Sequence, residues 1–131
     1  VKFVLAGGAG RLGVVTDTGQ PTPHSAQSLS GVAALALECN HDLESLHSGP
    51  YPESLKARVS SRFGHLNNHQ TTELLHRLDA TRVQWVLALH LSERNNSPEH
   101  ERATLKPALD NARYPLHLAT QDSPTAWLAV E

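Results

Sequence analysis

The chain lacks the residues and runs that mark secreted and membrane proteins. Its 131 residues include a single cysteine, Cys39, so no disulfide can form within the chain and no second thiol is available for a zinc site. No apolar run approaches the ~20 residues of a membrane helix. The N-terminus also lacks the basic and apolar layout of a signal peptide. These absences indicate a cytoplasmic protein with no membrane partner.

The sequence is also poor in aromatic residues and in net charge. Aromatic residues make up 5% of the chain and hydrophobic residues 39%, which is typical of a globular domain with a modest core. The formal net charge is −2, so no overall basic field would attract nucleic acid, although a local basic patch could. The chain begins with valine inside a strand-like run. We therefore expect one partial domain, residues 1–131, with further sequence upstream of it.

Short apolar runs alternate with helical patterns along the chain, which predicts an α/β fold. Thr22 before Pro23 and Ser97 before Pro98 are typical helix starts, and Asn68 is the expected cap of a further helix. The expected strands are 2–6, 11–16, 33–38, 83–89, 116–120 and 126–130. The expected helices are 23–30, 42–47, 52–60, 68–78 and 98–109.

The opening run contains G-x-G-x-x-G at Gly8, Gly10 and Gly13, the spacing of a dinucleotide-binding loop. Such a loop requires a helix after its third glycine, because the pyrophosphate sits on the helix N-terminus. Here Val-Val-Thr follows Gly13, and a glycine and a proline come soon after, a composition that disfavours a helix. The glycines are therefore better explained as a hairpin turn, with nucleotide binding as the weaker alternative.

Polar segments follow several of the expected strands. Asp17 comes just after the second strand, Glu38 and His41 end and follow the third, and His90 follows the fourth, while His65 precedes a helix. If these strands share one sheet, the five side chains could converge at its edge, where ligands in α/β proteins commonly bind. Imidazole and carboxylate together suit zinc, manganese or iron. Taken singly, each could instead be a turn cap or a surface residue.

Five motifs carry a resemblance to a known family. They are V-T-D-T-G, L-E-C-N-H-D, S-G-P-Y-P-x-x-L-K-x-R, G-H-L-N-N and L-H-L-S-E-R-N-N. Together they resemble the metallo-β-lactamase-fold hydrolases, and more narrowly the YycJ/WalJ-like subgroup of exonucleases and phosphodiesterases, relatives of tRNase Z. The resemblance runs over residues 2–131 and is strongest over 14–96. It implies that the α/β fold is the C-terminal part of a metallo-β-lactamase αββα sandwich.

The resemblance also implies a site for two divalent metal ions, with zinc foremost and manganese or iron as alternatives. Asp17 would bridge the two metals, and His90 would be the last histidine ligand of the second. Glu38 and His65 would sit beside the metals as catalytic residues and assist proton transfer to the leaving oxygen. The implied reaction is hydrolysis of a phosphodiester, either a nucleic acid or a small cyclic phosphate, by a hydroxide held between the metals.

Further residues of the motifs have less defined roles. His41 and Asp42 match the N-H-D segment of the subgroup and are near-site residues without an assigned function. Tyr51, Lys56 and Arg58 could face a substrate phosphate, but the stronger interpretation of these three residues is a solvated helix face.

The resemblance does not extend to all metal ligands. The family's H-x-H-x-D-H motif is absent, and so is a further histidine expected before Asp17. Zinc sites take three or four protein ligands per ion, so Asp17 and His90 alone would not hold two metals. We therefore expect an enzyme part that is inactive without its N-terminal part. A non-catalytic interaction module or degenerate remnant of the fold is the alternative. Part of the sheet would be left uncovered, which predicts self-association.

Overall fold

The computed structural model describes residues 1–110 and 114–131, and it confirms the α/β class. The strands are β1 (Lys2–Gly7), β2 (Gly10–Val15), β3 (Ala34–Glu38), β4 (Trp85–Leu89) and β5 (Leu116–Leu118). The helices are α1 (Pro23–Leu29), α2 (Leu43–Ser48), α3 (Glu53–Val59), α4 (Asn68–Arg77) and α5 (Pro98–Leu109). In the described residues, no helix is both long and apolar enough to cross a membrane.

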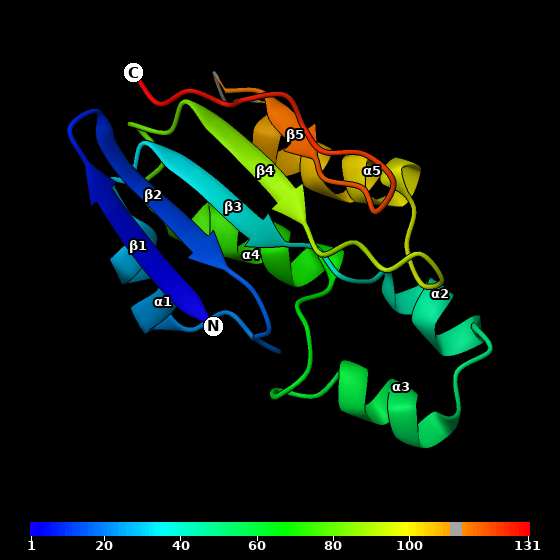
Figure 1. Ribbon diagram of the computed structural model, residues 1–131. Coiled ribbons are helices and arrows are strands. Elements are labelled where there is room, and N and C mark those ends of the chain that lie inside the picture. The colour runs from blue at the N-terminus through cyan, green and yellow to red at the C-terminus, as the bar shows by residue number, and fades with distance from the viewer. Residues whose placement is uncertain (111–113) are drawn as a thin grey trace.

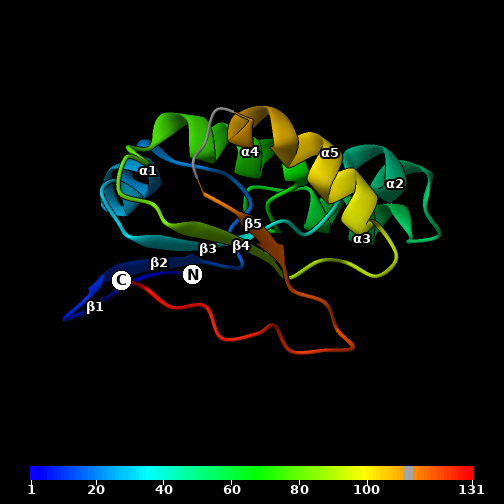
Figure 2. The same ribbon diagram turned by 90° about the horizontal axis from the view of Figure 1, so that it is seen from above.

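The strands form one sheet in the order β1-β2-β3-β4-β5 (Figure 1). β1 and β2 pair antiparallel, and β2, β3, β4 and β5 pair parallel. The helices lie over one face of this sheet, and the segment that follows β5 runs along the other face (Figure 2). The carboxyl ends of the parallel strands therefore meet at one edge. Within the described residues there is this single sheet, so the structure alone does not establish the two-sheet sandwich.

The opening glycines form a hairpin, as predicted. Gly7 pairs with Gly10, so the turn consists of two residues, Gly8 and Ala9. Gly13 lies within β2, and no helix follows it at the position that a dinucleotide loop requires. The nucleotide-binding interpretation therefore loses its structural basis.

The core lies between the sheet and the helices. Every residue of β3 is buried, because this strand lies in the middle of a sheet that has helices over one face and the C-terminal segment along the other (Figure 2). The core also takes Leu29 from α1, Leu74 from α4 and Leu105 from α5, each fully buried. This packing holds the end of β3, and with it Glu38, rigidly in place.

The N-cap of helix α4 lies one residue earlier than predicted. Its N-cap is Asn67, whose side chain accepts a hydrogen bond from the backbone N–H of Gln70, while the Gln70 side chain accepts one from the Asn67 N–H. This reciprocal arrangement is a capping box formed by asparagine and glutamine. Asn68, the residue expected to cap, is instead buried in the first turn.

The strand predicted over 126–130 does not form, and β5 ends at Leu118 rather than at residue 120. β4 already pairs with β3 and β5, so it has no free edge for another strand. The C-terminal segment is instead held by side chains of the region around β4. The indole of Trp85 donates to the carbonyl of Ala129 at 2.7 Å, and the amide group of Gln84 exchanges two hydrogen bonds with Glu131.

Large apolar side chains are exposed on β1, which forms one edge of the sheet. Phe3 is 54% exposed and Leu5 is 58% exposed, and Trp127 in the C-terminal segment is fully exposed. An apolar edge strand of this kind is a surface that can pair with another chain. Self-association of the chain stays a prediction.

Candidate metal centre

The structure brings together four side chains from separate segments at the carboxyl edge of the sheet. Asp17 lies in the loop after β2, Glu38 ends β3, His65 lies between α3 and α4, and His90 directly follows β4. One donor atom from each residue lies within 4.8 Å of the donor atoms of the other three. His41, the fifth residue expected to converge, is not part of this cluster.

Glu38 is the centre of the cluster and is completely buried. Its Oε1 lies 2.7 Å from Nδ1 of His65 and 2.7 Å from Nδ1 of His90. Its Oε2 accepts hydrogen bonds of 3.3 Å from the backbone N–H groups of Thr18 and Leu66. A buried carboxylate needs such donors, because an unpaired one would bear a large desolvation cost.

The shared carboxylate orients both histidine rings. With each Nδ1 bonded to Glu38, the Nε2 atoms of His65 and His90 are left for another partner, the usual arrangement where a carboxylate positions a metal-binding histidine. The two rings contact each other edge to face, with centroids 4.9 Å apart and an interplanar angle of 88°. Each ring is partly exposed, His65 by 28% and His90 by 39%, so a ligand can reach both.

Asp17 lies on the open side of the cluster. Its Oδ1 is 3.6 Å from Nδ1 of His65 and 4.0 Å from Nδ1 of His90, and its side chain is 55% exposed. These distances are too long for hydrogen bonds. The same Nδ1 atoms bond Glu38, so these distances place Asp17 beside the two rings without assigning the atoms that would bind a metal. Imidazole and carboxylate are ligands that zinc takes in proteins, so the chemistry of this donor set fits a divalent metal.

Two residues of the cluster have strained backbones. Asp17 has φ 51° and His90 has φ 63°, and they are the non-glycine residues with positive φ in the described part of the chain. Such strain tends to concentrate at functional sites, where the surrounding structure holds it. Around His90, the side-chain amide of Asn40 donates to the His90 carbonyl at 2.9 Å, and the Ser92 N–H donates to the Asn40 carbonyl at 2.8 Å.

A network of amides lies beneath the cluster and accounts for the paired asparagines of the motifs. Asn68 and Asn96 exchange two side-chain hydrogen bonds of 2.8 and 2.9 Å, and Asn96 also donates to the carbonyl of Cys39 at 3.0 Å. The Thr71 hydroxyl donates to the Glu38 carbonyl. These bonds connect the end of β3 to α4 and to the loop after β4. They fix the backbone that carries the four-residue cluster.

His41 and Asp42 lie beside the cluster with different surroundings. His41 is fully buried, and burial, with a smaller effect of His65, lowers its pKa to about 4, so the ring is neutral at pH 7. The Asp42 carboxylate accepts two 2.9 Å hydrogen bonds from Ser45, one from the N–H and one from the hydroxyl, and so caps α2. Neither residue belongs to the cluster of Asp17, Glu38, His65 and His90.

The interpretation of α3 as a solvated face is wrong for one residue. Lys56 is 8% exposed, and its ammonium donates to the carbonyl of His47 at 2.7 Å and to the carboxylate of Glu53 at 2.9 Å. It connects α3 to α2 and is not available to a phosphate. Tyr51 and Arg58, the other two candidates, line cavities next to the cluster.

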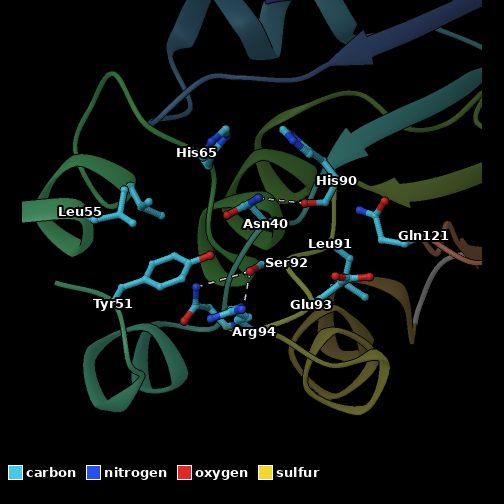
Figure 3. A pocket seen from close by; sticks show the side chains of 12 residues that line it. Asn40, Tyr51, Leu55, His65, His90, Leu91, Ser92, Glu93, Arg94 and Gln121 are labelled. Carbon is cyan, nitrogen blue, oxygen red and sulfur yellow. Dashed lines mark hydrogen bonds between the residues drawn. The ribbon is translucent and has the colours of Figure 1, made fainter.

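Two cavities lined by residues of the described chain adjoin the cluster. The first, of about 350 Å³, has His65 and His90 at one end and Tyr51 and Arg94 at the other (Figure 3). The second, of about 320 Å³, is lined by Asp17, Leu55, Arg58, Val59, Phe63, Gly64 and His65. Sequence reasoning missed Gln121 in the first cavity and Phe63 in the second. Arg94 lies inside a recognised motif, but nothing near Gln121 signals its position by the site.

Comparison with known proteins identifies relatives that are named as exodeoxyribonucleases. No family model matches the chain. The chain is, however, homologous to curated exodeoxyribonucleases of the WalJ and YycJ type, which confirms the YycJ/WalJ-like assignment made from the motifs.

The matches cover most of this chain but a minority of each relative. Exodeoxyribonuclease WalJ of Streptococcus pneumoniae (serotype 2, strain D39) is 35% identical over 92 residues, which are 70% of this chain and 34% of that protein. Exodeoxyribonuclease YycJ of Bacillus anthracis is 31% identical over 100 residues, which are 76% of this chain and 38% of that protein. The chain thus spans about a third of the length of these relatives.

Proposed function

We propose that this chain is the C-terminal part of a metal-dependent exodeoxyribonuclease of the metallo-β-lactamase αββα fold, with residues 1–131 as a partial domain. The observation that carries the proposal is the cluster of Asp17, Glu38, His65 and His90, built around one buried carboxylate. Its support is the homology to enzymes named as exodeoxyribonucleases. We also propose a cytoplasmic location, in which the free and buried Cys39 stays reduced.

In this proposal Asp17 and His90 hold divalent metal, zinc first and manganese or iron as alternatives. Bound metals would activate water for attack and neutralise charge on the phosphoryl oxygens. Zinc takes three or four protein ligands per ion. A pair of ions would therefore need ligands from outside these residues, and the chain would be inactive by itself.

Glu38 and His65 act together on the proton of the leaving group. Glu38 accepts a hydrogen bond from Nδ1 of His65, which fixes the orientation of the ring. The Nε2 atom of His65 is then free to donate a proton to the departing alkoxide. Because Glu38 holds His90 in the same way, loss of this one carboxylate would disturb both rings.

The cavity of about 350 Å³ next to His65 and His90 is large enough for a small ligand. Arg94 supplies a guanidinium that suits a phosphate, and Tyr51 supplies a ring and a hydroxyl. We assign this cavity to the part of the substrate next to the scissile phosphate. DNA is the proposed substrate, ahead of a small cyclic phosphate.

Metal binding by single variants tests the division of roles. In the complete enzyme, Asp17→Ala and His90→Ala should each weaken zinc or manganese binding at least tenfold, measured by competition with a chromophoric chelator. His65→Ala should keep its metal and, in the complete enzyme, slow DNA hydrolysis by about 10²–10⁴-fold, the range of a general acid.

His24→Ala is the matched control, since His24 is an exposed histidine outside the metal-site cluster. Equal loss of metal in the Asp17, His65 and His90 variants would contradict the proposed roles. Absence of any metal affinity that depends on Asp17 would contradict the metal site itself.

A further inference from the structure

A second feature near the candidate metal centre is an exposed aromatic ring. Phe63 is 81% exposed, and within the described chain only Trp127 among the large apolar side chains is more exposed. It lies two residues before His65 and lines the same cavity as His65 and Asp17. An exposed phenyl ring contributes little to the stability of the fold, so packing does not account for a phenylalanine at this position. Contact with a ligand would account for it.

The turn that carries Phe63 is held rigidly. The N–H of Phe63 donates to the Ser61 hydroxyl at 3.2 Å, and the N–H of Gly64 donates to the Ser61 carbonyl at 2.9 Å. Glycine is required at two contacts of this turn. A Cβ on Gly64 would lie 2.0 Å from the Val59 carbonyl oxygen, and one on Gly19 would lie 2.0 Å from the Ser61 carbonyl oxygen.

The tight packing at Gly19 also joins the Phe63 turn to the loop that carries Asp17. The backbone that positions the ring relative to the candidate metal centre is therefore preorganised. A ligand that binds a preorganised ring loses less free energy to ordering than one that binds a mobile ring.

Positive charge surrounds the ring. The guanidinium of Arg62 lies 4.4 Å from the centroid of the Phe63 ring, and Arg58 lines the adjoining cavity. In the described residues no ion pair joins either arginine to an acid. Asp17, a candidate metal ligand, is the one acidic residue that lines this cavity in the described part of the chain. This patch is a local exception to the net charge of −2.

An aromatic ring flanked by arginines is the usual platform for single-stranded nucleic acid. Bases stack on such rings whatever their sequence, and the cations contact the phosphates between them. We infer that Phe63, with Arg58 and Arg62, holds a base of single-stranded DNA next to the nucleotide under attack. The inference deepens the proposed function and rests on it for the identity of the substrate.

Binding measured without cleavage tests the platform. The probe is a fluorescein-labelled 12-nucleotide single-stranded DNA of mixed sequence, titrated with the chain in EDTA and followed by fluorescence anisotropy. Phe63→Ala should raise Kd about 5- to 100-fold, the range for loss of one stacked base. Phe63→Trp should restore binding, and Arg58→Gln should weaken it and lower its salt dependence.

Phe3→Ala is the matched control, because Phe3 is an exposed phenylalanine on β1 that lines neither of the two cavities. Circular dichroism verifies the folding of each variant. A version of the probe without bases should bind the unsubstituted chain and the Phe63→Ala chain equally. The inference is overturned if the Phe63→Ala chain binds the DNA as tightly as the unsubstituted chain. It is also overturned if Phe63→Ala weakens binding of the probe without bases as much as it weakens binding of the DNA, or if sedimentation shows that its main effect is on self-association.

The two proposals can fail separately. If metal affinity depends on Asp17 but Phe63 has no effect on DNA binding, the proposal of a metal-dependent hydrolase is supported and the proposal that Phe63 stacks on a DNA base is refuted. If DNA binding depends on Phe63 but no metal affinity depends on Asp17, base stacking by Phe63 is supported and the proposed metal site is refuted.

Discussion

Glu101 provides a quantitative test of the packing beneath the candidate site. It lies in α5, is fully buried, and neither carboxyl oxygen has a hydrogen-bond partner in the described part of the chain. Burial raises the pKa of Glu101 from 4.5 to about 7. Burial, together with the neighbouring Glu101 carboxylate, also raises the pKa of the Cys39 thiol well above its usual range.

The raised pKa makes the stability of the chain depend on pH. Between pH 4.5 and about 7, the unfolded chain releases the Glu101 proton and the folded chain keeps it. The free energy of unfolding therefore falls as the pH rises through this range. At about 1.4 kcal/mol for each pKa unit, the loss comes to about 3 kcal/mol.

The variant Glu101→Gln removes the titrating group and keeps its shape. Relative to the unsubstituted chain, its free energy of unfolding should be nearly unchanged at pH 4 and should become higher by about 3 kcal/mol at pH 8. Urea unfolding followed by circular dichroism at a series of pH values measures this difference. Glu99→Gln, an exposed glutamate of the same helix, is the control and should show no such trend. A constant difference for Glu101→Gln across the range would refute the reasoning.

Three further changes test other parts of the structure. Asn67→Ala removes the capping box of α4 and should cost about 1–2 kcal/mol, seen as a lower Tm, whereas an unchanged Tm would contradict the role of the cap. Gly19→Ala should destabilise the chain in urea unfolding, because the new Cβ would meet the backbone of Ser61; full stability would show that the contact is not tight. The exposed β1 edge should cause self-association that Leu5→Lys weakens, and equal sedimentation of both chains as monomers would end that prediction.

Much of the fold could be predicted from local patterns. The buried strand β3 follows from a continuous apolar run, and α1 follows from threonine and proline at its start. The β1–β2 hairpin follows from its glycines and from the β-branched residues after Gly13. The hairpin also explains why G-x-G-x-x-G here is not a nucleotide loop. These signals are reliable because each depends on neighbours within a few residues.

The local signals failed where a distant element decides the outcome. Residues 126–130 have a strand-like composition, but the segment runs along a face of the sheet and not beside an edge strand (Figure 2), so it bonds to the side chains of Gln84 and Trp85. Lys56 has the appearance of a surface residue in the sequence, yet it is buried between α2 and α3. The exposure of Phe63 and the burial of Glu101 likewise depend on what packs next to them.

The candidate site, like the fold, was predicted in part from the sequence and decided in part by the tertiary structure. The sequence by itself indicated which side chains could gather at one edge of the sheet, because each of them follows a strand, ends one or precedes a helix. These residues are Asp17, Glu38, His41, His65 and His90. Only the tertiary structure decided that one buried carboxylate serves both histidines and that His41 stays outside the cluster. The physical reason is that strand ends far apart in the chain become neighbours only when the parallel strands pair, and the sheet order sets which side chains share a hydrogen bond.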